Sequence, residues 1–200
     1  ILDRTFFGIY IQFGFDCLIE NNSIVAYNKV EQESGNGIHC WKSDSIKIIH
    51  NSITGHRDGI YFEFVTHSII WRNTSYKNIR YGLHFMFSNE NEYADNEFIN
   101  NGAGVAIMFS KFVKMLRNKF VENWGSASYG LLLKEIYDAE IEENIFDQNR
   151  IGVLFGYRFN KNVRIEAGYI SQILQFGRLI NGQNLFQNNN GIILNTNFNL

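Results

Sequence analysis

Hydrophobic and polar positions in this 200-residue chain follow a repeating pattern. A glycine is followed by alternating apolar residues, and this phrase returns at spacings of 29, 22, 23, 22 and 26 residues. It begins at Gly8, Gly37, Gly59, Gly82, Gly104 and Gly130. A period in this range is typical of repeat proteins, in which each unit buries its apolar face against the next one.

A second phrase with the same period lies between the glycines. It consists of an apolar residue, two variable positions, an asparagine, one more position and another apolar residue, and around Ile70 and Asn73 the last place is taken by Ser75. The other copies are Ile19/Asn22/Ile24, Ile48/Asn51/Ile53, Tyr93/Asn96/Phe98, Met115/Asn118/Phe120 and Ile141/Asn144/Phe146. Two short strands per period leave no room for a helix of ordinary length. The pattern therefore predicts an all-β parallel solenoid with coils about 4.8 Å apart. The asparagines should hydrogen-bond from coil to coil.

Alternation along a strand assigns the side chains that follow each glycine to two faces. We expect the first, third and fifth to point inward, because these positions are all apolar. They are Ile9/Ile11/Phe13, Ile38/Cys40, Ile60/Phe62/Phe64, Leu83/Phe85/Phe87, Val105/Ile107/Phe109 and Leu131/Leu133. The second and fourth then point outward in two columns. These columns are Tyr10, His39, Tyr61, His84, Ala106, Leu132 and Gln12, Trp41, Glu63, Met86, Met108, Lys134.

Composition is consistent with a continuous core. Apolar residues make up 45% of the chain, charged residues 19%, and there is no proline, which would remove a strand hydrogen bond. No apolar run reaches the roughly 18 residues of a membrane span. The chain opens inside a repeat without a signal-peptide pattern, so we interpret it as a fragment that lacks its N-terminus. Cys17 and Cys40 occupy apolar positions in different strands and are expected to be buried free thiols, unless the coils bring them close enough for a disulfide.

The pattern changes near residue 147. Residues 1–147 carry 13 basic and 19 acidic side chains, whereas residues 148–200 carry 5 and 1. The segment from Phe155 to Tyr169 reads as two strands joined at residues 160–162, which is a hairpin signal. We therefore expect a β-helix over residues 1–147 and a divergent tail over residues 148–200, whose hairpin caps the open end of the solenoid.

The outward columns carry the candidate chemistry. Histidine, tyrosine, tryptophan and methionine are unusual on a solvated strand face, so this surface is expected to be covered or used. His84 and Met86 share one strand, with Met108 one coil beyond Met86 and Glu63 one coil before it. Imidazole and thioether donors suit a soft ion such as Cu(I). The predicted metal site comprises His84, Met86, Met108 and Glu63, with His39 further along the first column. Packing of these side chains under a partner or a loop is the alternative.

Several long segments of the sequence resemble the NosD family. They include the segments 35–44, 55–66, 80–88, 101–109 and 123–134, such as Gly-His-Arg-Asp-Gly-Ile-Tyr-Phe-Glu-Phe-Val-Thr and Arg-Tyr-Gly-Leu-His-Phe-Met-Phe-Ser. The resemblance covers residues 1–147 and implies a right-handed parallel β-helix in the periplasm that binds copper. It also implies work with the ATPase and membrane subunits of an ABC transporter and with a copper chaperone, in building the copper-sulfur cluster of nitrous oxide reductase. The tail instead resembles strands of an uncharacterised bacterial β-barrel family.

Two other classes of function remain open from the residues. Parallel β-helices also host polysaccharide lyases and epimerases, and His56, Arg57 and Asp58 lie in one turn with Arg80 in the corresponding turn one coil later. Beside Tyr61, Glu63 and His84, these residues could abstract a proton next to a uronate carboxylate. They could instead form exposed ion pairs that fix the turns. A non-catalytic interaction scaffold is the third class. Nucleic acid is disfavoured as a partner, because the repeat region is acidic and has no basic stripe.

Overall fold

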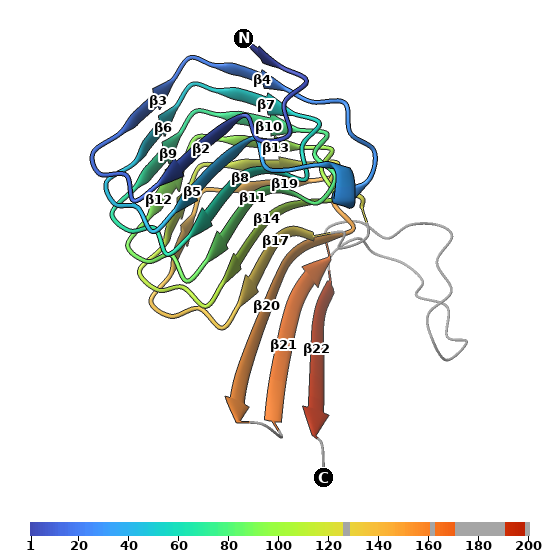
Figure 1. Ribbon diagram of the computed structural model, residues 1–200. Coiled ribbons are helices and arrows are strands. Elements are labelled where there is room, and N and C mark those ends of the chain that lie inside the picture. Colours follow the sequence, from blue (N-terminus) through green and yellow to red (C-terminus); the bar gives the residue numbers. More distant parts are fainter. Residues whose placement is uncertain (126–128, 161–162, 171–190, 199–200) are drawn as a thin grey trace.

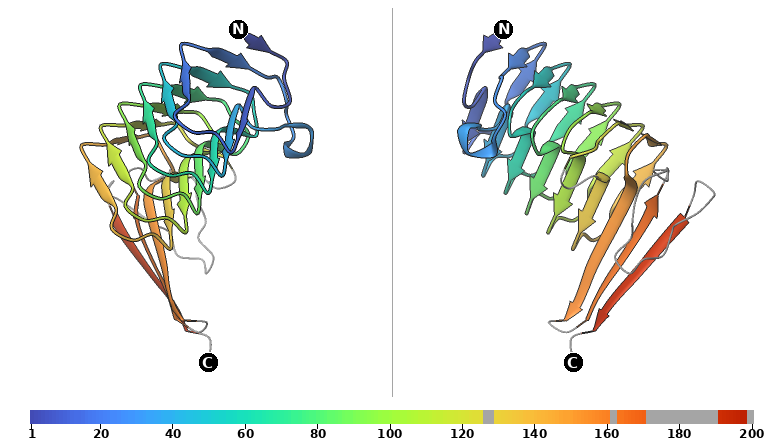
Figure 2. Two further views of the ribbon diagram at one scale, coloured as in Figure 1. Left: turned by 60° about the vertical axis from the view of Figure 1, so that its left-hand side comes forward. Right: turned by 90° about the vertical axis from the view of Figure 1, so that its right-hand side faces the viewer.

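The computed structural model describes residues 1–125, 129–160, 163–170 and 191–198. The chain winds through a stack of β-coils, which Figures 1 and 2 show from three directions. Its one helical element among the described residues is a 3-10 turn, η1 (Glu31–Glu33), inside the long first spacing between glycines. The all-β parallel solenoid predicted from the repeat is confirmed.

Each coil contributes one strand to each of three sheets, and the strands within a sheet are parallel along the solenoid. The six-stranded sheet contains β3 (Leu18–Glu20), β6 (Lys47–Ile49), β9 (Ile69–Trp71), β12 (Glu92–Ala94), β15 (Lys114–Leu116) and β18 (Glu140–Glu142). The seven-stranded sheet contains β1 (Leu2–Asp3), β4 (Ser23–Val25), β7 (Ser52–Thr54), β10 (Thr74–Tyr76), β13 (Glu97–Ile99), β16 (Lys119–Val121) and β19 (Ile145–Asp147).

The third sheet, called the long sheet below, has nine strands and carries the glycine phrases. It contains β2 (Ile9–Gln12), β5 (Ile38–Trp41), β8 (Asp58–Glu63), β11 (Tyr81–Met86), β14 (Ala103–Met108), β17 (Tyr129–Lys134), β20 (Ile151–Asn160), β21 (Val163–Ile170) and β22 (Gly191–Phe198). Its strands pair in the register expected from the glycines, so Leu83 lies beside both Ile60 and Val105.

The first and third positions after each glycine form the core, as predicted. Ile60, Phe62, Leu83 and Phe85 are fully buried. The prediction was wrong for the fifth position, however. Phe13, Phe64 and Phe87 are 65%, 45% and 41% exposed, and Phe109 is partly exposed. All four have φ between 50° and 54°, a left-handed conformation that ends the strand and breaks the alternation of side chains.

Two asparagine ladders hold the coils together. In the predicted ladder, the backbone N–H groups of Asn51, Asn73 and Asn96 each donate to the side-chain oxygen of the asparagine one coil later, at 2.8–3.0 Å. The second ladder uses the same bond and contains Asn78, Asn101, Asn123 and Asn149. Both ladders are buried, so they supply partners for turn backbone groups that water cannot reach.

The recurring glycines allow this close stacking. A Cβ atom at Gly59 would lie 2.6 Å from the Gly82 carbonyl oxygen, and one at Gly82 would lie 2.7 Å from the Gly104 oxygen. The amide nitrogens of Asn78 and Asn101 lie 2.9 Å from the same two positions. The glycine column is therefore packed against the second asparagine ladder, which leaves no space for a side chain.

The hairpin predicted in the tail is confirmed, because β20 and β21 pair antiparallel. β20 begins as an ordinary coil strand: Ile151–Gly156 is parallel to β17, and Asn149 still belongs to the second ladder. The parallel coil thus continues past the boundary expected near residue 147. The hairpin extends the long sheet (Figure 1), while β18 and β19 are the last described strands of the other two sheets. Residues 161–162, where the hairpin turns, lie outside the described residues.

The two cysteines are free, as predicted. The expected burial holds for Cys40 but not for Cys17, which is partly exposed. Burial of Cys40 in the core raises the pKa of its thiol well above the ordinary value. No helix in the described part of the chain is long and apolar enough to cross a membrane.

A charged cluster fixes one corner of the solenoid, between the long and six-stranded sheets. The Nδ1 atom of His67 lies 2.7 Å from Asp44 Oδ2, and its Nε2 atom contacts Glu90 in the next coil. The hydrogen bond to Asp44, helped by the charge of Glu90, raises the pKa of His67 above its ordinary value of 6.5.

The stability that His67 contributes is expected to fall as pH rises. A histidine whose pKa is raised by folding stabilises the protein fully below about pH 6.5, and the contribution is lost as pH rises through the folded-state value. The urea midpoint of wild type should therefore exceed that of His67→Gln at pH 6, and the difference should shrink at pH 9 and in 0.5 M salt. An equal difference under all three conditions would contradict this assignment.

Candidate functional site

The two outward columns of the long sheet lie in the register that the glycine phrase predicts. In the first, called the histidine column, strand pairing places Tyr10, His39, Tyr61 and His84 side by side in successive coils, followed by Ala106. In the second, the methionine column, it aligns Trp41, Glu63, Met86 and Met108. The rings of the histidine column pack along the stack, with centroid distances of 4.6, 4.8 and 5.0 Å from Tyr10 to His84.

His84 is the most enclosed histidine of its column. Only 6% of its surface is exposed, and its ring packs against Tyr61 and Tyr81. Its Nδ1 atom lies 3.3 Å from Asp58 Oδ2, at the start of β8 in the preceding coil. Its Nε2 atom is shielded from solvent and has no hydrogen-bond partner in the structure.

Asp58 is held by an arginine from the next coil. The Nε and Nη2 atoms of Arg80 donate to its two carboxylate oxygens at 2.8 and 2.6 Å. Burial alone would raise the pKa of Asp58, but the hydrogen bonds from Arg80 and His84 outweigh burial and lower it. The Asp58 side chain is completely buried, so this pair differs from the exposed ion pairs expected for these turns. Arg57 is not part of the pair, and its buried Nε atom has no partner in the structure.

The structure brings together four of the five predicted metal ligands. His84 and Met86 are two positions apart on β11, and Met86 pairs in register with Met108 on one side and Glu63 on the other. Met86, Met108 and Glu63 are partly exposed. Within the described residues, no three His, Cys, Asp or Glu side chains are grouped as a metal site. The soft donors on this face are the two thioethers and the free nitrogen of His84, a set suited to Cu(I).

His39, the fifth predicted ligand, is set apart from this group. Tyr61 lies between His39 and His84 in the histidine column, so the two histidines are two strand spacings, or about 10 Å, apart. The Nδ1 atom of His39 lies 3.1 Å from the amide nitrogen of Asn36. Burial, with a smaller effect from the charge of Arg57, lowers the pKa of His39 to about 4, so its ring is neutral at pH 7.

His56 occupies a structural position. Its backbone N–H donates to Asn78 Oδ1 at 3.1 Å, and its Nδ1 lies 3.0 Å from the Thr54 carbonyl oxygen. Asn73 makes the same two kinds of contact in the first ladder. His56 therefore replaces an asparagine at the start of the second ladder, fully buried and away from the outward columns. This placement argues against His56 as the proton acceptor of a lyase or epimerase.

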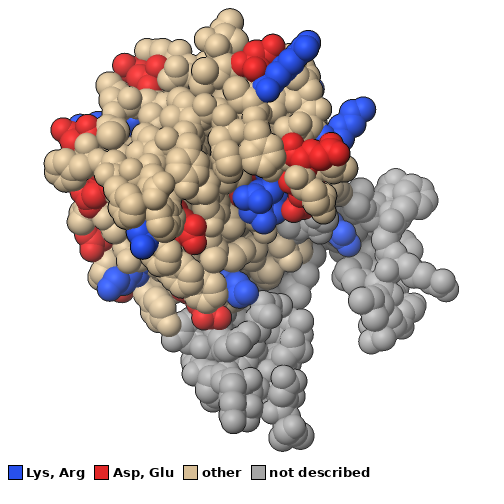
Figure 3. Space-filling model, in the orientation of Figure 1, with Lys and Arg blue, Asp and Glu red and all other residues tan. Residues whose placement is uncertain are grey.

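Stacked phenylalanines border the methionine column. Phe64, Phe87 and Phe109 follow directly after its members and form a ladder with centroid distances of 5.3 and 5.0 Å. The face of the molecule in Figure 3 is mostly uncharged, and its acidic and basic groups are scattered, without a continuous stripe of either sign. The exposed rings of Phe64 and Phe87 give the outward side of the long sheet an apolar strip beside the candidate donors.

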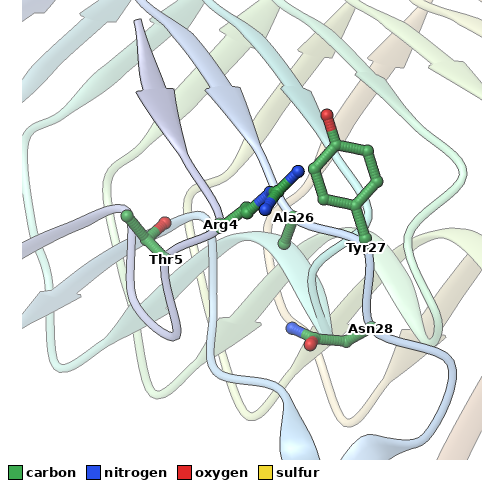
Figure 4. Close-up of a pocket in the computed structure, with 5 residues that line it drawn as sticks. All are labelled: Arg4, Thr5, Ala26, Tyr27 and Asn28. Atoms are coloured by element: carbon green, nitrogen blue, oxygen red, sulfur yellow. The ribbon is translucent and has the colours of Figure 1, made fainter.

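A separate pocket of about 370 Å³ lies at the first coil (Figure 4). It is lined by Arg4, Thr5, Ala26, Tyr27 and Asn28, and the Arg4 guanidinium lies 5.8 Å from the centre of the Tyr27 ring. None of the predicted site residues lines this pocket, so its position does not support a ligand site shared with the two columns.

Comparison of the chain with models of known protein families shows the family to which it belongs. The model of the family described as "Periplasmic copper-binding protein (NosD)" matches residues 15–199. The chain belongs to the NosD family. The family match extends through the tail, beyond residues 1–147, where the sequence motifs had indicated the resemblance. The NosD description names the periplasm and copper, in agreement with the localisation and the metal expected from the sequence. No curated protein matches the chain significantly.

Solved structures similar to this NosD-family chain are β-helix enzymes. A variant of the periplasmic alginate epimerase AlgG shares 22% identity over 71% of this chain and 33% of its own, with a TM-score of 0.63. The A-module of mannuronan C-5 epimerase AlgE4 from Azotobacter vinelandii shares 14% over 70% and 50%, with a TM-score of 0.61. The chain thus spans half or less of these proteins. At such identities the likeness shows the fold alone.

The sequence patterns placed the turn of Asp58 beside His84 but did not indicate a direct contact between the two side chains. Asp58 lies just before the glycine of its phrase, where the alternation has not begun, so the pattern assigned it to a turn. In the structure it pairs with Tyr81 at the start of β11, which places its carboxylate near a histidine 26 residues later. The second asparagine ladder was also missed, although its spacing of 23, 22 and 26 residues from Asn78 to Asn149 was a usable signal.

Proposed function

We propose that this chain is an accessory protein that receives or delivers copper or sulfur during assembly of the copper-sulfur centre of nitrous oxide reductase. The observation that carries the proposal is the grouping of His84, Met86 and Met108 on one face of a chain whose family is described as copper-binding. Thioether and imidazole donors favour Cu(I) over hard ions, which prefer oxygen ligands. Glu63 borders this group, and His39 lies further along the same face.

The proposed partners are the ATPase and membrane subunits of an ABC transporter, a copper chaperone and the reductase itself. Transfer of an ion between proteins requires the two sets of ligands to approach each other, so a partner has to cover the methionine column. The ladder of Phe64, Phe87 and the partly exposed Phe109 lies directly beside that column and supports such contact, because interface cores are rich in aromatic side chains.

Titration with Cu(I) against a competing chelator, without oxygen, tests the proposal. Wild type should bind about one Cu(I) per chain, and the His84→Ala/Met86→Ala double variant should bind at least 100-fold more weakly. Two controls lie outside the site: Met115→Leu replaces a core methionine, and His50→Ala removes an exposed histidine. If wild type and the double variant bind equally, the site assignment fails. If neither binds copper, copper handling by this chain fails.

The competing function is that of a uronate lyase or epimerase. Arg80 is occupied by Asp58, and His56 is buried in a ladder, so neither is free to act on a bound sugar. Incubation with alginate or pectin should therefore give no unsaturated product, measured by its ultraviolet absorbance. Sustained product formation that His56→Ala abolishes would favour the enzyme instead.

A further inference from the structure

The environment of His84 determines which of its two nitrogens is free. Asp58 is ionised and fully buried, since both of its oxygens accept hydrogen bonds from Arg80. An ionised carboxylate is an acceptor only, so a hydrogen bond across the 3.3 Å between His84 Nδ1 and Asp58 Oδ2 requires a proton on Nδ1. In a neutral ring this leaves the lone pair on Nε2, the atom that is shielded from solvent and has no partner in the structure.

We propose that Asp58 is a positioning residue that holds His84 in the Nδ1–H tautomer and thereby presents Nε2 as the nitrogen donor to Cu(I). Histidines that ligate metals commonly donate their other ring N–H to a carboxylate, which fixes the tautomer and the orientation of the ring. Arg80 has a supporting role, because its two hydrogen bonds hold the carboxylate in one orientation. The copper part of this inference rests on the function proposed above; the tautomer part does not.

The neighbouring coil lacks this arrangement. There the positions equivalent to Asp58 and Arg80 are held by Asn36 and Arg57, as the hydrogen bonds between the coils show. Asn36 Oδ1 and Arg57 Nε are both buried without a partner, and the amide nitrogen of Asn36 faces His39 Nδ1. Stacking of the coils therefore does not require a carboxylate and arginine pair at this place. The pair occurs where it contacts the histidine beside the two methionines.

The tautomer can be read directly from the copper-free protein. In two-dimensional NMR of ring nitrogens at pH 7.5, with His84→Gln to assign the signal, His84 should show a protonated Nδ1 and an unprotonated Nε2. A protonated Nε2, or protons on both nitrogens, would overturn the proposal. This measurement needs no variant at Asp58, so it holds even if such a variant fails to fold.

The positioning role is tested with Asp58→Asn. An amide offers one oxygen where the carboxylate offered two, and it must serve three donors from Arg80 and His84. We expect Cu(I) affinity to fall 10- to 100-fold, the usual effect of removing an outer-shell partner, together with a mixed His84 tautomer. Asp44→Asn is the matched control, because it weakens a carboxylate–histidine contact outside the site, the one between Asp44 and His67, and should leave copper affinity unchanged.

The outcomes separate this inference from the function on which it rests. Unchanged copper affinity in a folded Asp58→Asn variant would overturn the positioning role while leaving the copper site in place. Failure of wild type to bind Cu(I), with His84 still in the Nδ1–H tautomer, would refute the proposed function and the donor role of Nε2, but not the tautomer assignment. An equal loss of affinity in Asp44→Asn would also overturn the proposal, because the effect would then not depend on His84.

Discussion

An Asn96→Ala variant is expected to lose about 4 kcal/mol of unfolding free energy, a large fraction of the 5–15 kcal/mol typical of a domain. Asn96 Oδ1 accepts from the Asn73 backbone N–H at 2.8 Å, and its amide donates to the carbonyls of Ile70 and Ala94 at 2.9 Å. Alanine leaves the buried Asn73 N–H unpaired, at about 1–3 kcal/mol, and removes one hydrogen bond from each carbonyl, at about 0.5–1.5 kcal/mol. The Ala94 oxygen still accepts from the Arg72 N–H at 3.1 Å. Urea unfolding followed by circular dichroism measures the loss.

Asn100→Ala is the control for this prediction. Asn100 lies four residues away, is exposed, and has a φ of 52°, a conformation that alanine tolerates less well than asparagine. Its replacement should lower the unfolding free energy by at most about 1 kcal/mol, because only the backbone preference of asparagine is lost and the ladder stays intact. If both variants lost the same stability, the ladder would not be the source of the effect.

A Gly82→Ala variant is expected to be destabilised by about 3 kcal/mol, the upper end for overpacking a rigid site. The added methyl group would lie 2.7 Å from the Gly104 carbonyl oxygen, 2.8 Å from Phe98 Cδ1 and 2.9 Å from Asn101 Nδ2. All three neighbours are buried, so relief requires the two coils to move apart. The same unfolding measurement applies, with Thr74→Ala as a control on the outward face of β10. A loss below about 0.5 kcal/mol would show that the coils adjust easily.

The sequence was sufficient to predict the coil and its core. Alternation at Ile60 and Phe62 marked the buried face, because a side-chain period of two is fixed by strand geometry. The alternation could not predict where each strand stops. Phe64 continues the apolar alternation, yet its backbone is left-handed and its ring is 45% exposed. Composition does not reveal this change, since a phenylalanine in a turn and one in the core look identical in a pattern.

The candidate site was predictable only as far as it follows strand register. Met86 and Met108 were placed side by side because equivalent positions of parallel coils are neighbours. The contact between Asp58 and His84 was not predictable, since it joins a residue before one glycine phrase to a residue within the next phrase. Its formation depends on the path of the turn, for which the periodic pattern provides no rule.

The separation of columns has a consequence for how such a protein can change over time. Glycines, asparagines and inward apolar residues hold the coils together, whereas the outward positions on β8, β11 and β14 are largely free of that task. Mutation can therefore rewrite the outward face while folding remains under selection elsewhere in the same repeat. A duplicated coil would also bring a new pair of outward positions already in register. One scaffold can in this way acquire, shift or lose a binding surface without a new fold.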